Sequence, residues 1–409
     1  MASSTRNNFV LPAVFLLVVA GVAGLQGLSG PEGNVSGQNT KLVPPPSTRP
    51  ALPAEFRGVT LQLHSGDPKH PYEKLIDEIA ETGANTLQLV VPGYQENASS
   101  TSIFLDARRG PGPRRVVELV KYAKGKGLMV VLMPIVLLSN AREGEWRGKI
   151  KPEKWDHWWG EYNSFILHNA GLAQEGGADV FMVGSELILT EYQTDRWRAL
   201  IAEVRKAFKG RLSYSSNWDH YTSIAWWDDL DLIGMTTYYN LSHGKKPTLD
   251  VLLDSWRPIR KDILDWQATV NRPILFTEVG WPNQVTAAEF PWDYYRSPNS
   301  PDPPQQANCY ESFFRTWAND PSSAGWIVWE WRTGLDQRAD EKDTGYSPQG
   351  KPAMAIVKKY FEQARIADSQ RPQPAVPTTQ NGHQDTPALL SPAPPTDETL
   401  DEPWDEAED

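Results

Sequence analysis

The sequence predicts an α/β protein formed by a single (β/α)8 barrel, and three observations lead to this fold class. Eight short apolar segments, rich in β-branched residues, recur between residues 56 and 333, as expected for parallel strands covered on both faces. Amphipathic helical stretches separate most of these segments. The count of eight matches a closed barrel. A doubly wound open sheet is the alternative, although the first segment lacks the glycine-rich turn of its nucleotide-binding members.

The predicted strands occupy residues 56–63, 84–92, 127–138, 179–187, 212–219, 231–240, 273–281 and 325–333. Three stretches between them have apolar residues three or four positions apart and end at a glycine, which predicts helices over residues 72–83, 114–127 and 195–210. The connection between the fifth and sixth strands is short, so the barrel pattern is weakest there.

Composition narrows the function classes. The 409 residues include 17 Trp, 14 Tyr and 12 Phe, and such rings either fill a large core or form surfaces on which sugar rings stack. The net charge is −11, but eight acidic and no basic residues lie from Asp397 onward, which leaves −3 for the rest. A body this close to neutral lacks the basic face of a nucleic-acid-binding protein. The single cysteine, Cys309, excludes an internal disulfide and argues against a cysteine-based metal site.

The N-terminal residues 1–28 carry Arg6, then an apolar run from Phe9 to Val19, and then small residues. This pattern predicts a cleavable signal peptide, or a membrane anchor if the segment is not cut. Both interpretations place the barrel outside the cytoplasm, as a periplasmic, secreted or membrane-anchored protein.

Shifts in composition mark the limits of the barrel. Residues 29–54 are rich in Pro, Gly and Ser and predict a linker. Residues 368–409 are Pro-rich before they become acidic, and they predict a disordered tail because they carry too little apolar surface to fold. The barrel is therefore expected within residues 55–367, and we expect a monomer.

Catalytic residues of such barrels lie at the carboxyl ends of the strands. The predicted ends carry a ring of polar and aromatic side chains: His64, Glu186, Asn217, Trp218, Asp219, Tyr238, Tyr239, Glu278, Trp281, Trp329, Glu330 and Trp331. Glu186 and Glu278 end strands on roughly opposite sides of the barrel, so their carboxyl groups can meet across it. Burying a carboxylate is costly unless it is paired, so each is either a functional acid or the structural partner of a buried base.

Two facing carboxyl groups suit the cleavage of a glycosidic bond. One donates a proton to the leaving oxygen, and the other, ionised, attacks the anomeric carbon or activates water. The sequence contains no Gly-Lys-Ser/Thr phosphate loop, no nucleophile-elbow serine and no His-Glu-x-x-His zinc helix. We expect neither a metal nor an organic cofactor.

The segments "FMVGSEL", "TTYYN", "LFTEVGW" and "IVWEWRT" resemble glycoside hydrolases of clan A, whose acid/base ends the fourth strand and whose nucleophile ends the seventh. Within that clan the chain is most similar to glycoside hydrolase family 113, whose members act on β-1,4-mannan. The resemblance extends from "EFRGVTLQ" through "DTGYSPQGKPA" and covers the barrel without either terminus. It implies that Glu186 is the acid/base and that Glu278 is the nucleophile. Many clan members carry Asn before the acid/base, where this chain has Ser185, so the resemblance fixes the reaction class better than the sugar.

The resemblance also implies residues that bind the substrate. A tyrosine at the end of the sixth strand hydrogen-bonds the nucleophile in clan A, and Tyr238 or Tyr239 matches it. A tryptophan of the eighth strand lines the sugar site, and Trp329 and Trp331 are expected to point the same way, so either or both could serve. Position at the strand ends, and not the resemblance, adds His64, Asn217, Trp218 and Trp281 to the predicted substrate-binding set.

We therefore expect an exported, retaining, endo-acting β-glycosidase with β-mannan or a related β-1,4-linked polysaccharide as its substrate. Retention requires the two carboxyl groups to lie about 5–5.5 Å apart, against about 6.5–9.5 Å for inversion. Two alternatives stay open. One is another clan A specificity, such as a β-galactosidase, a β-glucanase or an exo-mannosidase, and the other is a barrel that binds carbohydrate without cleaving it.

Overall fold

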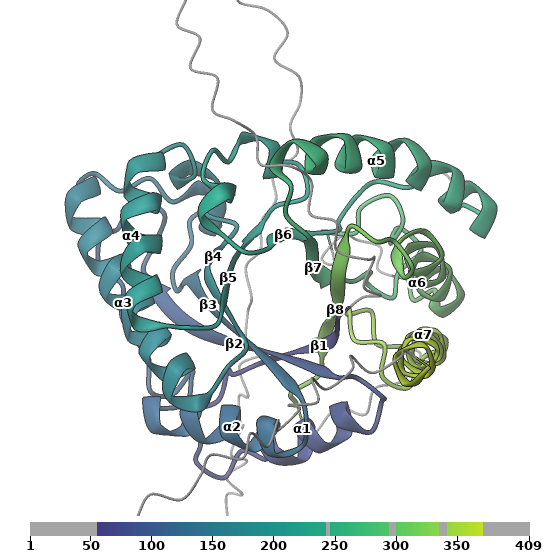
Figure 1. The fold of residues 1–409 in the computed structure, drawn as a ribbon, viewed down its shortest axis with the longest axis horizontal. Coiled ribbons are helices and arrows are strands. Elements are labelled where there is room, and N and C mark those ends of the chain that lie inside the picture. Colours follow the sequence, from purple (N-terminus) through teal and green to yellow (C-terminus); the bar gives the residue numbers. More distant parts are fainter. Residues whose placement is uncertain (1–54, 243–245, 294–299, 335–341, 371–409) are drawn as a thin grey trace, which may run out of the picture. The chain divides into compact units, whose positions relative to one another are not determined.

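The computed structural model describes residues 55–242, 246–293, 300–334 and 342–370, and within them it confirms the predicted closed barrel (Figure 1). Eight parallel strands pair in sequence order, and the ring closes where β1 (Phe56–Gln62) pairs with β8 (Ser323–Trp331). In Figure 1 the strands form a ring that the helices surround. The predicted signal or anchor segment, the predicted linker and nearly all of the predicted tail lie outside the described residues.

The remaining strands each overlap one predicted segment: β2 (Thr86–Gln95), β3 (Met129–Leu138), β4 (Val180–Ser185), β5 (Arg211–Ser216), β6 (Ile233–Thr236) and β7 (Ile274–Val279). The α-helices of the described residues are α1 (Tyr72–Ala80), α2 (Pro113–Gly125), α3 (Trp155–Gly176), α4 (Thr194–Ala207), α5 (Leu249–Val270), α6 (Pro303–Trp317) and α7 (Pro352–Ser369). The three helices predicted from spacing are α1, α2 and α4. No helix in this part of the chain is both long and apolar enough to span a bilayer.

The short connection between β5 and β6 contains two 3₁₀ turns, η3 (Tyr221–Ser223) and η4 (Trp227–Asp229), where other connections carry an α-helix. Trp226 and Trp227 of this connection are buried. The Trp226 ring stacks on Trp197 of α4 with a centroid separation of 4.7 Å. Indole rings therefore cover the strands at the place where a helix is missing.

Buried apolar side chains form two layers, because alternate residues of a strand point to opposite faces. The outer layer lies between strands and helices and includes Ile79, Val120, Ile166, Trp197, Trp256, Phe313 and Val357. The inner layer fills the barrel with Phe56, Val90, Val131, Met133, Ile135, Val180, Met182, Leu232, Tyr238, Leu275, Ile327, Trp329 and Tyr346. Since the interior is packed, chemistry is confined to the end where the strands finish, which we call the mouth.

The last helix extends the folded barrel slightly beyond its predicted boundary. Helix α7 continues to Ser369, and Asp368 pairs with Arg57 of β1 at 2.7 Å. Residues 368 and 369 therefore belong to the barrel and not to the tail.

Candidate active site

Close to the mouth, each of three strands contains one residue more than the neighbouring strand with which it pairs. The pairing register shifts in β4 before Ser185, in β7 before Glu278 and in β8 before Trp331. An extra residue interrupts the alternation of side chains and re-aims those that follow, a device that is common next to active sites. Three acids lie at or beside these irregularities: Glu186, Glu278 and Glu330.

Glu278, near the end of β7, is 3% exposed. The hydroxyl of Tyr238, just after β6, donates a hydrogen bond of 2.8 Å to Oε2 of Glu278. Tyr239 does not reach this carboxyl group. Its ring packs on Trp256 of α5, and its hydroxyl donates to the backbone carbonyl of Trp218 at 2.9 Å. Of the two tyrosines that the resemblance offered, the structure brings only Tyr238 to Glu278.

Glu186, directly after β4, is 4% exposed and has a left-handed backbone with φ of 51°. Its amide donates to the carbonyl of Ser215 in β5 at 2.8 Å, which anchors the turn. Gly184 precedes it at a point where a Cβ would lie 2.5 Å from the Tyr162 hydroxyl. Glycine at this position therefore lets the end of β4 pack closely against Tyr162, Trp197 and Tyr214.

Arg147 is a partner of Glu186 that the sequence did not reveal. It lies in η1 (Arg147–Lys149), in the connection between β3 and α3, and its Nη2 atom lies 2.5 Å from Oε2 of Glu186. Both side chains are almost fully buried. Glu186 therefore has the buried base that a structural acid would have, and a catalytic role must be compatible with this ion pair.

The two acids influence one another electrostatically. Burial raises the pKa of Glu278 to about 8, and the negative charge of Glu186 adds to the rise, whereas Arg147 and the Tyr238 hydrogen bond oppose it. Burial also raises the pKa of Glu186, and Arg147 opposes that rise. Because the groups are coupled, protons leave the pair in two steps rather than from independent sites. A pair that keeps one proton between two carboxyl groups can supply one acid and one nucleophile.

Two further acids extend this cluster. Glu330 of β8 accepts a hydrogen bond from the side-chain amide of Gln62 in β1, and burial raises the pKa of Glu330 to about 7. Asp219, after β5, accepts a hydrogen bond of 2.8 Å from Asn217. The charge of Glu330 raises the pKa of Glu278, and that of Asp219 raises the pKa of Glu186. The mouth is therefore rich in carboxyl groups, and Arg147 is in direct contact with one of them, Glu186.

Aromatic rings line the same region. Trp329 and Tyr238 belong to the inner layer, and the ring of Tyr346 lies 6.0 Å from that of Tyr238. Trp218 and Trp292 are partly buried against this layer and stack with ring centroids 5.8 Å apart. Trp292 and Tyr346 lie in the connections after β7 and β8, and the sequence did not single them out.

Two predicted substrate-binding tryptophans lie in the outer layer instead. Trp281 is fully buried, with its ring 5.3 Å from that of Tyr310 in α6. Trp331 is directed toward α1, where its Nε1 atom donates to Glu78 at 3.2 Å. The expectation that Trp329 and Trp331 point the same way is wrong, because the extra residue in β8 breaks the alternation between them.

His64 follows β1 and is partly buried. Burial lowers the pKa of His64 to about 4, and the positive charge of Arg109 adds to this shift. The imidazole is therefore neutral at neutral pH. A neutral imidazole can donate or accept a hydrogen bond, so His64 remains a prediction as a sugar contact.

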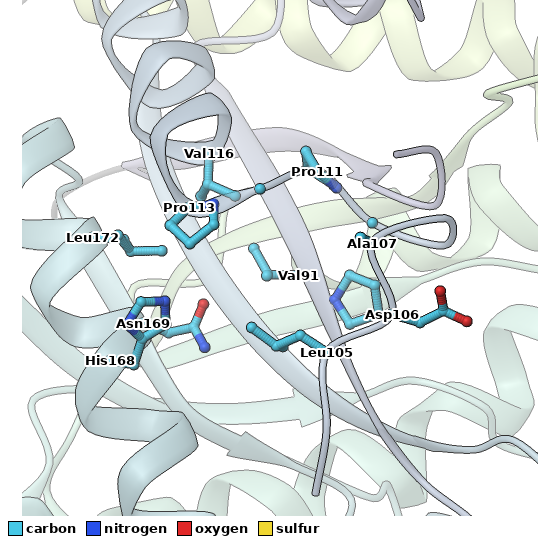
Figure 2. A pocket seen from close by; sticks show the side chains of 13 residues that line it. Val91, Leu105, Asp106, Ala107, Pro111, Pro113, Val116, His168, Asn169 and Leu172 are labelled. Atoms are coloured by element: carbon cyan, nitrogen blue, oxygen red, sulfur yellow. The ribbon is translucent and has the colours of Figure 1, made fainter. Parts of the chain in front are cut away.

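A separate hollow of about 130 Å³ lies on the outside of the barrel, between β2, α2 and α3 (Figure 2). Figure 2 shows its largely apolar lining, with Val91, Leu105 and Leu172 beside the polar His168 and Asn169. Glu186, Glu278 and Glu330 do not line it. Within the described ranges, no group of three or more His, Cys, Asp or Glu is placed to hold a metal ion. The acids at the mouth are thus the best candidates for chemistry.

Comparisons with known proteins identify a family and several similar structures. Residues 68–351 match Glycoside Hydrolase Family 113. A solved β-mannanase of that family from Alicyclobacillus acidocaldarius, in complex with ManMIm, is 28% identical with a TM-score of 0.68, over 76% of this chain and 98% of that one. Two other solved β-1,4-mannanase structures of the family are 27% and 26% identical, with TM-scores of 0.65 and 0.68, over 75% of this chain and 98% and 99% of theirs. A search of curated proteins found no match.

Proposed function

Because the chain belongs to glycoside hydrolase family 113, we propose that it hydrolyses β-1,4-mannan with retention of configuration at the anomeric carbon. The observation that carries the proposal is the arrangement of Glu186, Glu278 and Tyr238 at one mouth, with two acids coupled and the phenol bonded to one of them. The similarity to three β-mannanase structures at 26–28% identity supports mannan as the substrate.

The proposed reaction has two displacements at the anomeric carbon. In the first, a carboxylate oxygen of Glu278 bonds to that carbon as the glycosidic bond breaks, and Glu186 gives its proton to the departing oxygen. In the second, Glu186 takes a proton from water, the water oxygen bonds to the carbon, and the bond to Glu278 breaks. The products are two shorter saccharides, and both carboxyl groups return to their starting states.

The resemblance to clan A gives the division of roles, and the Tyr238 hydrogen bond supports it, whereas the contact between Arg147 and Glu186 acts against it because it favours the carboxylate of Glu186. The Tyr238 hydrogen bond favours the charged form of Glu278, which is the form that attacks. With Glu278 charged, its negative field favours the protonated form of Glu186, which is the form that donates. The same pair of residues thus carries one negative charge and one proton at the start of the cycle.

Substrate contacts would come from the aromatic and polar groups around the acids. Trp329 and the stacked pair of Trp218 and Trp292 offer ring faces for sugars. Glu330 and Asp219 can accept hydrogen bonds from hydroxyl groups. These contacts, rather than the two catalytic carboxyls, would set the preference for mannose over other hexoses.

One observation favours the alternative of a barrel that binds carbohydrate without cleaving it. The buried contact between Arg147 and Glu186 is what a purely structural acid would make. The alternative of another clan A specificity rests on Ser185, which stands where many clan members carry Asn.

Turnover of mannan, glucan, xylan and galactan, with the first product anomer followed by NMR, tests the proposal. We expect cleavage of mannan and a β-anomer as the initial product. An initial α-anomer would contradict retention, and cleavage of another polymer would move the assignment to another clan A specificity. Binding to a polymer without turnover would support the non-catalytic barrel.

We further propose that the enzyme acts outside the cytoplasm. Support comes from the charge and apolar pattern of residues 1–28, which lie outside the described residues, and from the polymeric substrate, which is too large to cross a membrane unaided. Cell fractionation with N-terminal sequencing of the mature protein tests this. Recovery of full-length protein in the cytoplasmic fraction would contradict it.

A further inference from the structure

The ion pair between Arg147 and Glu186 is not required by a two-carboxylate mechanism, yet the structure fixes it firmly. Arg147 lies in the η1 turn, which packs against η2 (Ile188–Thr190), the turn that follows Glu186 directly. The η1 turn is itself tight, because a Cβ at Gly148 would lie 2.5 Å from the Trp146 ring. The guanidinium is therefore held in place relative to the carboxyl group by two adjoining turns.

The groups that face Glu186 differ in whether their charge changes during the reaction. Arg147 supplies a guanidinium group, whose charge the reaction does not change. Glu278 is negative before it attacks and carries no charge once it has formed an ester with the sugar. Further titratable groups of the described residues also interact electrostatically with Glu186, among them Asp219 after β5, Glu191 after η2, Tyr238 after β6 and Tyr346 after β8.

This arrangement combines one fixed charge with one variable charge. Arg147 favours the carboxylate form of Glu186. In the reactive form of the free enzyme, the negative charge of Glu278 favours the protonated form instead, so Glu186 can hold the proton that the first step needs. In the glycosyl-enzyme that negative charge has gone, and Arg147 favours the carboxylate of Glu186. The carboxylate is the form that accepts a proton from water in the second step.

We propose that Arg147 is a positioning residue that holds Glu186 as the general base of the second step and so favours hydrolysis of the glycosyl-enzyme. This inference rests on the proposed function, because it assigns the two displacements to Glu278 and Glu186. It also accounts for the ion pair, which would otherwise count against a catalytic Glu186.

The variant Arg147→Gln, assayed with a 4-nitrophenyl β-mannoside, separates the two steps because the activated leaving group needs little help from an acid. We expect a burst of nitrophenol followed by a slower steady state, since the glycosyl-enzyme accumulates. The pH at which the slow phase reaches half its maximum rate should rise by about 1–3 units, the usual effect of losing an opposite charge beside a carboxyl group. Azide, which attacks without a general base, should restore the steady-state rate.

Two matched variants control for loss of structure. Arg147→Lys keeps the charge and should give a smaller burst and a smaller pH displacement, and it serves as the test if Arg147→Gln does not fold. Arg57→Gln removes another buried arginine, one that pairs with Asp368 in the last helix, and it should lower stability without a burst. If wild-type enzyme cleaves mannan and both Arg147 variants keep its burst amplitude and pH profile, the inference is wrong.

The protonation of Glu186 can also be measured without turnover. This measurement tests the inference separately from the proposed function. Absence of turnover by the wild type would count against the proposed function alone. Infrared difference spectroscopy follows the protonation of Glu186 directly through its carboxyl band. The variant Glu186→Gln lacks this band and so identifies it. We expect the titration midpoint of Glu186 to lie at higher pH in Arg147→Gln than in wild type, and equal midpoints would overturn the inference.

Discussion

The hydroxyl of Tyr238 donates a hydrogen bond of 2.8 Å to Oε2 of Glu278 and links the ends of the neighbouring strands β6 and β7. Burial raises the pKa of Tyr238 well above its usual value, so the phenol remains a donor across the working range. The bond is therefore a permanent stabiliser of the Glu278 carboxylate, which makes it the most direct place to test the assignment of the nucleophile.

Tyr238→Phe should raise the pKa of Glu278 further and move the acidic limb of kcat/KM to higher pH. A hydrogen bond to a charged group contributes about 1.5–3 kcal/mol, which corresponds to about 1–2 pH units. The pH profile of kcat/KM measures the displacement. Tyr239→Phe is the matched control, because that hydroxyl bonds to the Trp218 carbonyl instead, and it should leave the acidic limb in place. Equal profiles for both variants would contradict the role given to Tyr238.

Replacing the two acids should give different products with azide. Glu186→Ala should slow mannan cleavage by about 10²–10⁴-fold, the usual contribution of acid–base catalysis, and azide should then yield a β-glycosyl azide. Glu278→Ala should yield the α-azide, because azide takes the place of the missing nucleophile. NMR of the azide products distinguishes the two. Glu311→Gln removes a buried acid of α6 and should give neither azide product.

Substitutions of Trp329 and Trp331 should affect different properties of the protein, activity in the first case and stability in the second. Trp329→Ala should lower kcat/KM at least about tenfold, the effect of about 1.4 kcal/mol of lost transition-state contact. Trp331→Ala should instead lower the free energy of unfolding by about 3–5 kcal/mol while the folded enzyme keeps its kcat/KM. Urea unfolding and kinetics at a temperature where both variants are folded provide the comparison. A loss of activity confined to Trp331→Ala would mean that the two rings had been assigned to the wrong layers.

Glu191 allows a test of how a buried carboxyl group changes the pH dependence of the free energy of unfolding. It accepts a hydrogen bond of 2.7 Å from Tyr214, and burial raises the pKa of Glu191 to about 8. Between about pH 4.3, its unfolded value, and about pH 8, the folded protein keeps a proton that the unfolded chain has lost. This group alone therefore lowers stability by about 1.4 kcal/mol per pH unit in that window.

Glu191→Gln does not titrate, so the free energy of unfolding of this variant relative to wild type should increase from pH 5 to pH 7.5. Urea unfolding at the two pH values measures it. Glu311→Gln is the matched control and should be less stable than wild type by the same amount at both pH values. Contacts with Arg315 and Lys359 outweigh burial and lower the pKa of Glu311, so wild type gains stability from this acid above about pH 4.3. A constant difference for Glu191→Gln at both pH values would show that Glu191 does not titrate in this range.

The barrel could be predicted from the sequence because its strands are continuous apolar runs, whose signal does not depend on which face a residue occupies. The directions of the side chains at the mouth could not be predicted from the sequence. Strict alternation would place Trp331 beside Trp329, and the extra residue in β8 prevents this. A single inserted residue leaves no clear mark in composition or spacing, although it decides whether a ring meets the substrate or a helix.

Residues in irregular connections were missed for a different reason. Arg147, Trp292 and Tyr346 lie in segments without periodicity, so no pattern marks them before the chain is folded. The same limit applies to the large number of tryptophans. Many of them, such as Trp197 and Trp226, pack in the outer layer, and the sequence alone allowed both that interpretation and a sugar-binding one.

The crowding of indole rings outside the barrel has an optical consequence. Excitation energy passes efficiently between stacked rings such as Trp197 and Trp226, whose centroids are 4.7 Å apart. We therefore expect the intrinsic emission to follow denaturation closely and to respond weakly when a saccharide arrives. The difference between the emission spectra of wild type and Trp292→Phe should isolate the emission of Trp292, which we expect the saccharide to quench.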